Sequence, residues 1–315
     1  MLPGILSRGD QHTLWIYLST LALVWLFAAL LPSPSSTTHM IQQILPSVRV
    51  DFHPSRSPYN ESKLGLMVDS RPLPQLAPLL LHMMSVAGPD WRFLFLGSNE
   101  SVALVNTSFA VRQQLEAGRL SLREMPEENV TTSQEQYSQL FTNLAFYESL
   151  LPAEFLWVFH ADSVICANSE QNLDDWLEYD WVGAPWDESK SVSWNTRKGN
   201  MPGGDGGFSL RRISRVMEVL RFQTRYVEDI DPEDEWLAAR IGNLPNAKMA
   251  SPNDERRFCV EDQWYEQPMG YHLGRVLEAS GDPIWNDPQR RRAIFDYCPE
   301  VKMVLPMVKV NRTCF

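Results

Sequence analysis

Residues 61–315 alternate between short apolar runs and segments with apolar positions at helical spacing. The runs predict strands at residues 64–68, 92–96, 155–159 and 181–185. The helical spacing predicts helices at residues 75–86, 137–147, 212–222, 236–241 and 288–297, the last opened by Asp287 as N-cap and Pro288 at the first position. Strands that alternate with helices predict an α/β fold whose mainly parallel sheet is covered on both faces.

A longer apolar run precedes this region. Residues 14–31 carry no charge and, at about 1.5 Å per helical residue, are long enough to cross the core of a bilayer. The run is too long for a typical signal peptide, and no clean cleavage site follows it. We therefore expect a cytoplasmic tail at residues 1–12 and a transmembrane signal anchor at residues 13–32. A cleaved signal peptide and a buried soluble helix are the alternatives.

Signals after the apolar run indicate a lumenal body. Asn-x-Ser/Thr glycosylation acceptors occur at Asn60, Asn99, Asn106, Asn129 and Asn311. The four cysteines, whose pairing the sequence leaves open, are Cys166, Cys259, Cys298 and Cys314. Residues 33–60 are rich in Pro and Ser and are expected to form a flexible stalk. These features predict a single-pass type II membrane glycoprotein of the Golgi or ER, with a lumenal domain at residues 61–315.

The overall charge narrows the possible partners. Hydrophobic residues make up 44% of the chain, which is enough for a sizeable core. The net charge is −11, and the one compact basic run is at residues 290–292. We therefore expect no nucleic-acid partner, because such partners require a basic surface.

Polar clusters follow the predicted strands. Asp162 comes just after the run at residues 155–159, where open α/β sheets bind ligands, and a carboxylate there suits a divalent cation or a diphosphate. A glycine-rich segment follows at residues 202–211, then acidic residues at 231–235, and then a third cluster that joins residues 258–261, which end in Glu261, with residues 268–272, which end in His272. Each cluster alone has a structural alternative: a capping Asp, a flexible turn, a favourable helix N-terminus or a core His. Together they predict metal binding, close approach of a substrate and proton transfer.

The order of these clusters resembles the metal-dependent glycosyltransferases of the GT-A fold, in which an Asp-x-Asp motif follows a buried strand. Here the corresponding residues are His160, Ala161 and Asp162, so a His stands in place of the first Asp. The resemblance implies that the remaining carboxylate, Asp162, binds the metal.

A closer resemblance is to a family of glycosyltransferase-like proteins, common in fungi, that carries a domain of unknown function. The matching motifs are Asp-Ser at 162–163, Tyr-Asp-Trp-Val-Gly-Ala-Pro-Trp at 179–186, Gly-Gly-Phe-Ser-Leu-Arg at 206–211, Glu-Asp at 233–234 and Gly-Tyr-His at 270–272. The resemblance covers residues 62–275. It implies a GT-A-like domain in which Asp69 and Arg71 face the donor nucleotide.

These features together predict an enzyme, a hexosyltransferase that uses a nucleotide sugar, with a UDP-sugar as donor and Mn²⁺ or Mg²⁺ as cofactor. The acceptor would be a sugar, glycoprotein or glycolipid. The expected metal ligands are Asp162 and His272. If the reaction inverts the anomeric centre, the expected base is Asp234 or Glu233, with Asp234 the stronger candidate, and the positive end of the helix is expected to keep it ionised. A retaining enzyme need not use this base. The expected donor-binding residues are Asp69, Arg71, Asp162, Ser163, Trp186, Gly203, Gly204, Gly206 and Gly207.

An inactive relative is the alternative to an enzyme. It would be a membrane-tethered carbohydrate-binding or scaffold protein on the same fold. His160 in place of an Asp favours this alternative. The acidic cluster at residues 233–235 speaks against it, because a binding module does not need a base.

Overall fold

The computed structural model describes residues 8–30, 57–125, 133–186, 203–274 and 284–305. The chain divides into two compact units, Met1–Arg56 and Ser57–Phe315. The first contains helix α1 (Arg8–Leu30). Across the described ranges, no helix is both long and apolar enough to cross a membrane. The anchor expected at residues 13–32 stays a prediction, and residues 31 and 32 lie outside the described ranges. Most of the expected stalk, and residues 1–7 of the expected tail, lie outside the described residues.

The second unit is built on a six-stranded sheet with the strand order β3-β2-β1-β4-β7-β6. Its strands are β1 (Lys63–Val68), β2 (Arg92–Gly97), β3 (Leu120–Glu124), β4 (Phe155–Phe159), β6 (Trp181–Ala184) and β7 (Asp205–Arg212). The strands β1 to β4 run parallel to one another, whereas β7 is antiparallel to both β4 and β6. The predicted mainly parallel α/β sheet is therefore confirmed.

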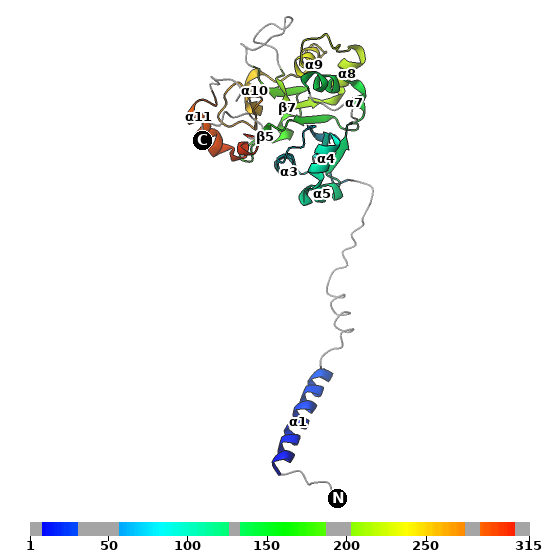
Figure 1. The fold of residues 1–315 in the computed structure, drawn as a ribbon, viewed down its shortest axis with the longest axis vertical. Helices are drawn as coiled ribbons and strands as arrows, with labels where there is room; N and C mark the ends of the chain where they lie inside the picture. Colours follow the sequence, from blue (N-terminus) through cyan, green and yellow to red (C-terminus); the bar gives the residue numbers. More distant parts are fainter. Residues whose placement is uncertain (1–7, 31–56, 126–132, 187–202, 275–283, 306–315) are drawn as a thin grey trace. The chain divides into compact units, whose positions relative to one another are not determined.

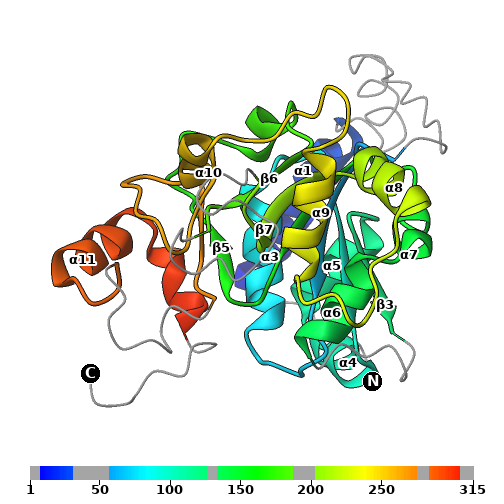
Figure 2. The same ribbon diagram turned by 90° about the horizontal axis from the view of Figure 1, so that it is seen from above.

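Helices cover both faces of this sheet, as Figures 1 and 2 show. The helices of the unit are α3 (Leu76–Val86), α4 (Asn99–Asn106), α5 (Phe109–Glu116), α6 (Gln134–Phe141), α7 (Leu144–Glu148), α8 (Ile213–Phe222), α9 (Glu233–Ile241), α10 (Pro252–Phe258) and α11 (Pro288–Tyr297), with short 3₁₀ turns η2 (Leu173–Trp176) and η3 (Pro299–Met303). On one face, Phe93 and Trp157 pack edge to face, with ring centroids 6.3 Å apart, in a core shared with α3 to α5. On the other face, Leu66 and Leu156 belong to a core shared with α6 to α9.

A smaller sheet lies beside the main one and brings distant parts of the chain together. Its strands are β5 (Ser163–Ile165), β9 (Gly270–His272) and β8 (Cys259–Val260), in the order β5-β9-β8. The register places Ser163 opposite His272. A disulfide joins Cys166, just after β5, to Cys298, just after α11. Cys259 is buried and unpaired, and Cys314 lies outside the described residues.

Two local expectations need correction. The helical spacing between Tyr137 and Tyr147 is divided between α6 and α7, because the side chain of Asn143 accepts a hydrogen bond from the Ala145 N–H and starts a new helix. The glycine-rich segment is only partly a turn. Strand β7 begins at Asp205, so Gly206 and Gly207 lie within the sheet. The predicted helix of residues 288–297, capped by Asp287, is confirmed.

Candidate functional site: an acidic pocket beyond strand β4

A pocket of 740 Å³ is formed by residues from six parts of the chain. They are the start of α6, the turn after β4, Trp186 after β6, the start of β7, the segment that leads from α8 into the start of α9, and the segment around β8 and β9. The lining includes Tyr137, His160, Asp162, Trp186, Asp205, Gly206, Gly207, Glu233, Asp234, Glu261 and His272. The fold therefore brings together the carboxylate after β4, two of the glycines, the acidic pair and the C-terminal histidine, as the sequence predicted.

The turn that carries Asp162 is fixed against β7. The His160 N–H donates to the Gly207 carbonyl at 2.8 Å, and the Ser163 hydroxyl donates to the same carbonyl at 2.7 Å. Ser163 is fully buried. Its hydroxyl is thus used to hold the turn, and its expected contact with the donor stays a prediction.

His272 lies at the centre of the carboxylates. Its Nε2 is 3.4 Å from Asp162 Oδ1, and its Nδ1 is 3.0 Å from Asp205 Oδ1 and 3.3 Å from Glu261 Oε2. Both ring nitrogens of this buried side chain therefore face carboxylates. Such a ring can carry a proton that the carboxylates stabilise, or, when it is neutral, can ligate a cation.

The ionisable groups in this cluster shift one another's pKa values. Burial lowers the pKa of His272, but Glu261, Asp205 and Asp162 outweigh it and raise the pKa well above its ordinary value. Burial raises the pKa of Asp162, and His272 more than reverses this effect, so that pKa falls below its usual range. Burial and Asp205 raise the pKa of Glu261 to about 7. The cluster therefore favours a positive charge at its centre, carried by a proton or by a metal ion.

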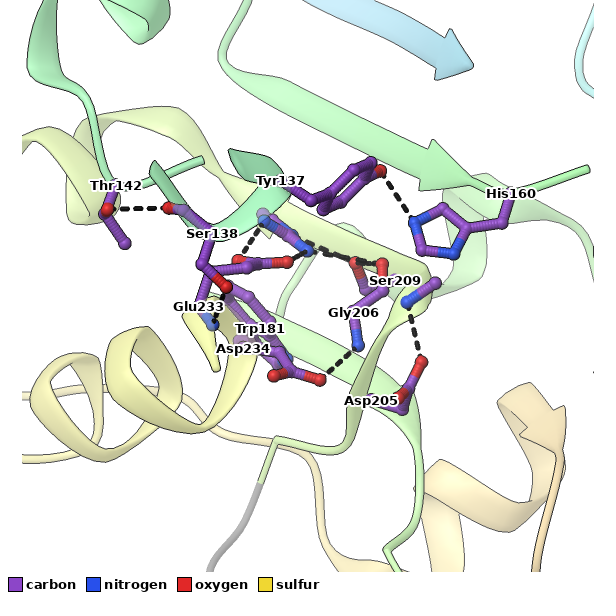
Figure 3. A network of polar contacts seen from close by, with 12 residues as sticks. Tyr137, Ser138, Thr142, His160, Trp181, Asp205, Gly206, Ser209, Glu233 and Asp234 are labelled. Atoms are coloured by element: carbon purple, nitrogen blue, oxygen red, sulfur yellow. Dashed lines mark hydrogen bonds and ion pairs between the residues drawn. The ribbon is translucent and has the colours of Figure 1, made fainter. Parts of the chain in front are cut away.

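Gly207 allows the rings of two histidines to pack directly against the backbone of β7. A Cβ at this position would lie 2.5 Å from His272 Nε2 and 2.7 Å from His160 Nδ1. The other ring nitrogen of His160 is hydrogen-bonded to the Tyr137 hydroxyl at 2.6 Å, as Figure 3 shows. Burial lowers the pKa of His160 to about 4, so its ring is neutral near pH 7. In the tautomer whose Nε2–H donates to Tyr137, Nδ1 of His160 carries a lone pair and can act as a ligand beside Asp162 and His272.

The two residues of the acidic pair have different partners (Figure 3). Both carboxylate oxygens of Glu233 are bound by Arg211, at 2.7 and 2.9 Å. Asp234 accepts one backbone N–H on each oxygen, from Gly206 and from Glu235, both at 2.9 Å. The sequence led us to expect that the helix N-terminus keeps this carboxylate ionised. Instead, burial, Asp205 and Glu233 raise the pKa of Asp234 well above its ordinary value.

The remaining predicted residues lie outside the lining of this pocket. Asp69 follows β1 and accepts three hydrogen bonds from Arg71, one from its backbone N–H and two from its guanidinium. Gly203 and Gly204 have positive φ angles of 131° and 78° and pack against β6, where the Trp181 indole N–H donates to the Gly204 carbonyl. Their expected contacts with a donor stay predictions.

The sequence did not assign a role to two of the converging carboxylates, Asp205 and Glu261. Asp205 stands among four glycines, and the presence of a carboxylate within this glycine-rich segment was the available signal in the sequence. Glu261 follows the short strand β8, which is only two residues long. Such a strand has no periodic pattern, so only the tertiary structure could place Glu261 beside His272.

Comparisons with known proteins give limited further information. Residues 119–272 match the model of a family described as a protein of unknown function (DUF5672). This stretch contains every potential ligand named above. The expected similarity to a family with a domain of unknown function is thus confirmed for this stretch, whereas the fungal origin and the individual motifs stay predictions. No curated protein matches the chain.

Several solved structures are distantly similar to the chain. One is core-mannan synthase A from Aspergillus fumigatus in its Mn/GDP form, with 9% identity and a TM-score of 0.37 over 59% of this chain and 73% of that one. Another is the galactosyltransferase LgtC with donor and acceptor sugar analogues. Its identity is 11% and its TM-score 0.43, and the match covers 80% of this chain and 98% of that one. A mannosyltransferase from Pyrobaculum calidifontis with GDP-Man and Mn²⁺ has 12% identity and a TM-score of 0.38, and the match covers 56% of this chain and 50% of that one. Similarity at this level does not assign an activity to the chain.

Proposed function

We propose that this chain is a glycosyltransferase that moves a sugar from a nucleotide sugar to an acceptor hydroxyl with the help of a divalent cation. The observation that carries the proposal is the convergence of Asp162, Asp205, Glu261 and His272 in one pocket that also contains Asp234. Potential cation ligands and a buried carboxyl with a raised pKa are what such a transfer requires.

The pocket's charge explains why a cation is needed. Its carboxylates are Glu135, Asp162, Asp205, Asp231, Glu233, Asp234, Glu235, Glu261 and Asp262. Arg225 is the one Lys or Arg side chain among the described lining residues, and it is already paired with Glu135. A nucleoside diphosphate would be repelled from such a surface, so it can bind there only together with a cation.

The residues of the pocket fit a divalent cation. Asp162, His160 and His272 offer oxygen and nitrogen ligand atoms that lie within 4.8 Å of one another. Asp205 and Glu261 offer further oxygens on the other side of the His272 ring. A bound cation would neutralise the charge that develops on the departing diphosphate. His160 thus supplies a ligand at the position where the resemblance leads one to expect an Asp.

The proton of the acceptor hydroxyl must go to a base, and we assign this role to Asp234. Its raised pKa makes it a stronger base than an ordinary carboxylate once it is ionised. Each of its oxygens accepts only one backbone N–H, so lone pairs remain for the acceptor hydroxyl. Glu233 is less suited, because Arg211 binds both of its oxygens. We assign Glu233 the role of positioning the start of α9.

A thermal-shift and hydrolysis screen tests the proposal. Purified protein would be heated with UDP- and GDP-hexoses, with Mn²⁺ and with EDTA. We expect at least one donor to raise the melting temperature with Mn²⁺ only, and the same donor to be slowly hydrolysed. Binding without hydrolysis or transfer would favour the inactive binding protein instead. Absence of any shift across the panel would contradict the proposal.

We further propose that the second unit works in an oxidising, lumenal compartment. The disulfide between Cys166 and Cys298 supports this, since such bonds persist in oxidising environments. The described acceptors Asn60, Asn99 and Asn106 are exposed, as glycosylation requires. Asn129 and Asn311 lie outside the described residues. Enzymatic removal of N-glycans should lower the apparent mass of protein from its native host, and an unchanged mass would contradict this placement.

A further inference from the structure

Apolar side chains stand exposed beside the acidic pocket. They belong to the segment between α8 and α9, where Tyr226 is 65% exposed, Val227 66% and Ile230 73%. We call these three residues the rim patch. Ile230 also lines the pocket, together with its neighbour Asp231. The rim patch and the pocket lining therefore share Ile230.

The backbone under the rim patch is held in place by Arg225. Its side chain is 3% exposed and makes a bidentate ion pair with Glu135 at 2.8 and 2.9 Å. Its guanidinium also donates to the carbonyls of Asp229 at 3.1 Å and Asp231 at 2.9 Å. The Asp229 N–H closes a turn onto the Tyr226 carbonyl at 3.0 Å. The apolar side chains are thus presented on a fixed backbone, which reduces the ordering cost of binding a ligand.

Charge decides which ligand the rim patch suits. Carboxylates of Glu228, Asp229 and Asp231 flank it in the sequence, and the pocket it adjoins is rich in carboxylates. A phosphate-linked lipid or an anionic membrane surface would be repelled here. A neutral glycoside would not be repelled, and its apolar part would remove the rim patch from water.

We propose that the rim patch binds the apolar part of a neutral glycoside acceptor, whose sugar hydroxyl enters the pocket beside Asp234. This inference rests on the proposed transferase function and adds a substrate class to it. The rim patch provides an aromatic ring and two branched aliphatic side chains, which suit an alkyl or aryl group attached to a sugar.

Binding of alkyl glycosides tests the inference. Methyl and hexyl glycosides of glucose, galactose and mannose would be titrated into full-length protein with Mn²⁺ and UDP or GDP, below the concentrations at which micelles form. We expect at least one hexyl glycoside to bind at least about tenfold more tightly than its methyl counterpart. A hexyl glucuronide should bind more weakly than the neutral hexyl glucoside, because its carboxylate meets the acidic pocket.

Variants locate the effect. The double variant Tyr226→Ser/Val227→Ser, at the two rim-patch residues outside the pocket lining, should reduce the hexyl-to-methyl affinity ratio to less than about twofold, while affinity for Mn²⁺ and nucleotide is unchanged. The matched control is Phe109→Ser, which removes a 68% exposed apolar side chain on α5 and should keep the ratio.

The outcomes separate this inference from the proposed function. Absence of nucleotide binding in the wild-type protein would contradict the proposed transferase function itself. Normal nucleotide binding without a hexyl preference, or with a preference that the double variant keeps, would overturn the acceptor inference alone. Binding to phosphatidylserine vesicles that the double variant loses would also overturn it, since the rim patch would then contact a membrane.

Discussion

Arg211 and Glu233 form a buried bidentate ion pair that joins β7 to the start of α9. The two nitrogen–oxygen distances are 2.7 and 2.9 Å, and the Arg211 side chain is fully buried, 4.2 Å from the ring centroid of Trp181. Asp234 is next in the sequence and accepts the Gly206 N–H from β7. The ion pair therefore fixes the position of Asp234 relative to the glycines of the pocket.

Loss of one partner of this pair should strongly destabilise the fold. In Glu233→Gln, the charge of Arg211 remains buried without its counter-ion, so we expect the free energy of unfolding to fall by about 3 kcal/mol or more. Denaturant unfolding measures the change. Glu218→Gln, which breaks an exposed pair with Arg215, is the control and should cost less than about 1 kcal/mol. Similar losses in both variants would contradict a stabilising role for the buried pair.

Asp234 should affect turnover and not donor binding. Asp234→Asn keeps the shape of the side chain but cannot accept the proton, so turnover should fall by about 10²–10⁴-fold while Mn²⁺-dependent donor affinity stays near that of the wild type. Initial transfer rates at saturating donor measure the effect. Glu116→Gln, on α5 and outside the pocket, is the control. Turnover within a few-fold of the wild type would show that Asp234 is not the base.

Metal preference should depend on His160. A nitrogen ligand favours Mn²⁺ over Mg²⁺, because Mg²⁺ prefers oxygen ligands. In the presence of nucleotide, we therefore expect the wild type to bind Mn²⁺ at least about tenfold more tightly than it binds Mg²⁺. His160→Asp should narrow this difference. Calorimetric titration with each metal measures it, with His82→Gln, which lies outside the pocket on α3, as control. An unchanged Mn²⁺ to Mg²⁺ ratio in His160→Asp would show that His160 is not a ligand.

Glu255 should make stability depend on pH. Its carboxylate accepts the Gly203 N–H, and burial raises its pKa from 4.5 to about 7. Between these values the unfolded chain loses the proton that the folded chain keeps, so stability falls as pH rises from about 4.5 to 7. Glu255→Gln has no such penalty. It should gain up to about 3 kcal/mol relative to the wild type between pH 4 and pH 8.

Unfolding of both proteins at a series of pH values measures this gain. Glu261 titrates in the same range in both proteins, so the difference between the two curves isolates Glu255. Parallel curves would contradict the raised pKa.

Local patterns in the sequence were sufficient for β1, β2, β4 and β6 of the main sheet, whereas β3 and β7 were not among the predicted strands. Continuous apolar runs such as residues 155–159 can be buried on both faces only inside a covered sheet, and β4 has these bounds. The position of Asp162 after such a strand was likewise predictable, because the carboxyl end of a strand in this fold class is where ligands bind. These inferences require only neighbours in the sequence.

The charge state of the site was not predictable in this way. The position of Asp234 at a helix N-terminus predicted an ionised carboxylate. The pKa of Asp234 instead depends on burial, on Asp205 and on Glu233, and Asp205 comes from strand β7, which is distant from α9 in the sequence. The availability of His160 as a ligand depends on Tyr137, from a helix that precedes β4. Both features arise from tertiary contacts that no sequence period records.

The affinity of Asp162→Asn for UDP and GDP, measured by calorimetry with and without Mn²⁺, tests the central claim most directly. The variant keeps the shape of the side chain and removes the charge beside His272. We predict that Mn²⁺ increases nucleotide affinity in the wild type and in the control Asp296→Asn, on α11, and that Asp162→Asn loses at least about tenfold of this gain while remaining folded. Equal Mn²⁺-dependent affinity in Asp162→Asn and the wild type would contradict a cation-assisted nucleotide site at the end of β4.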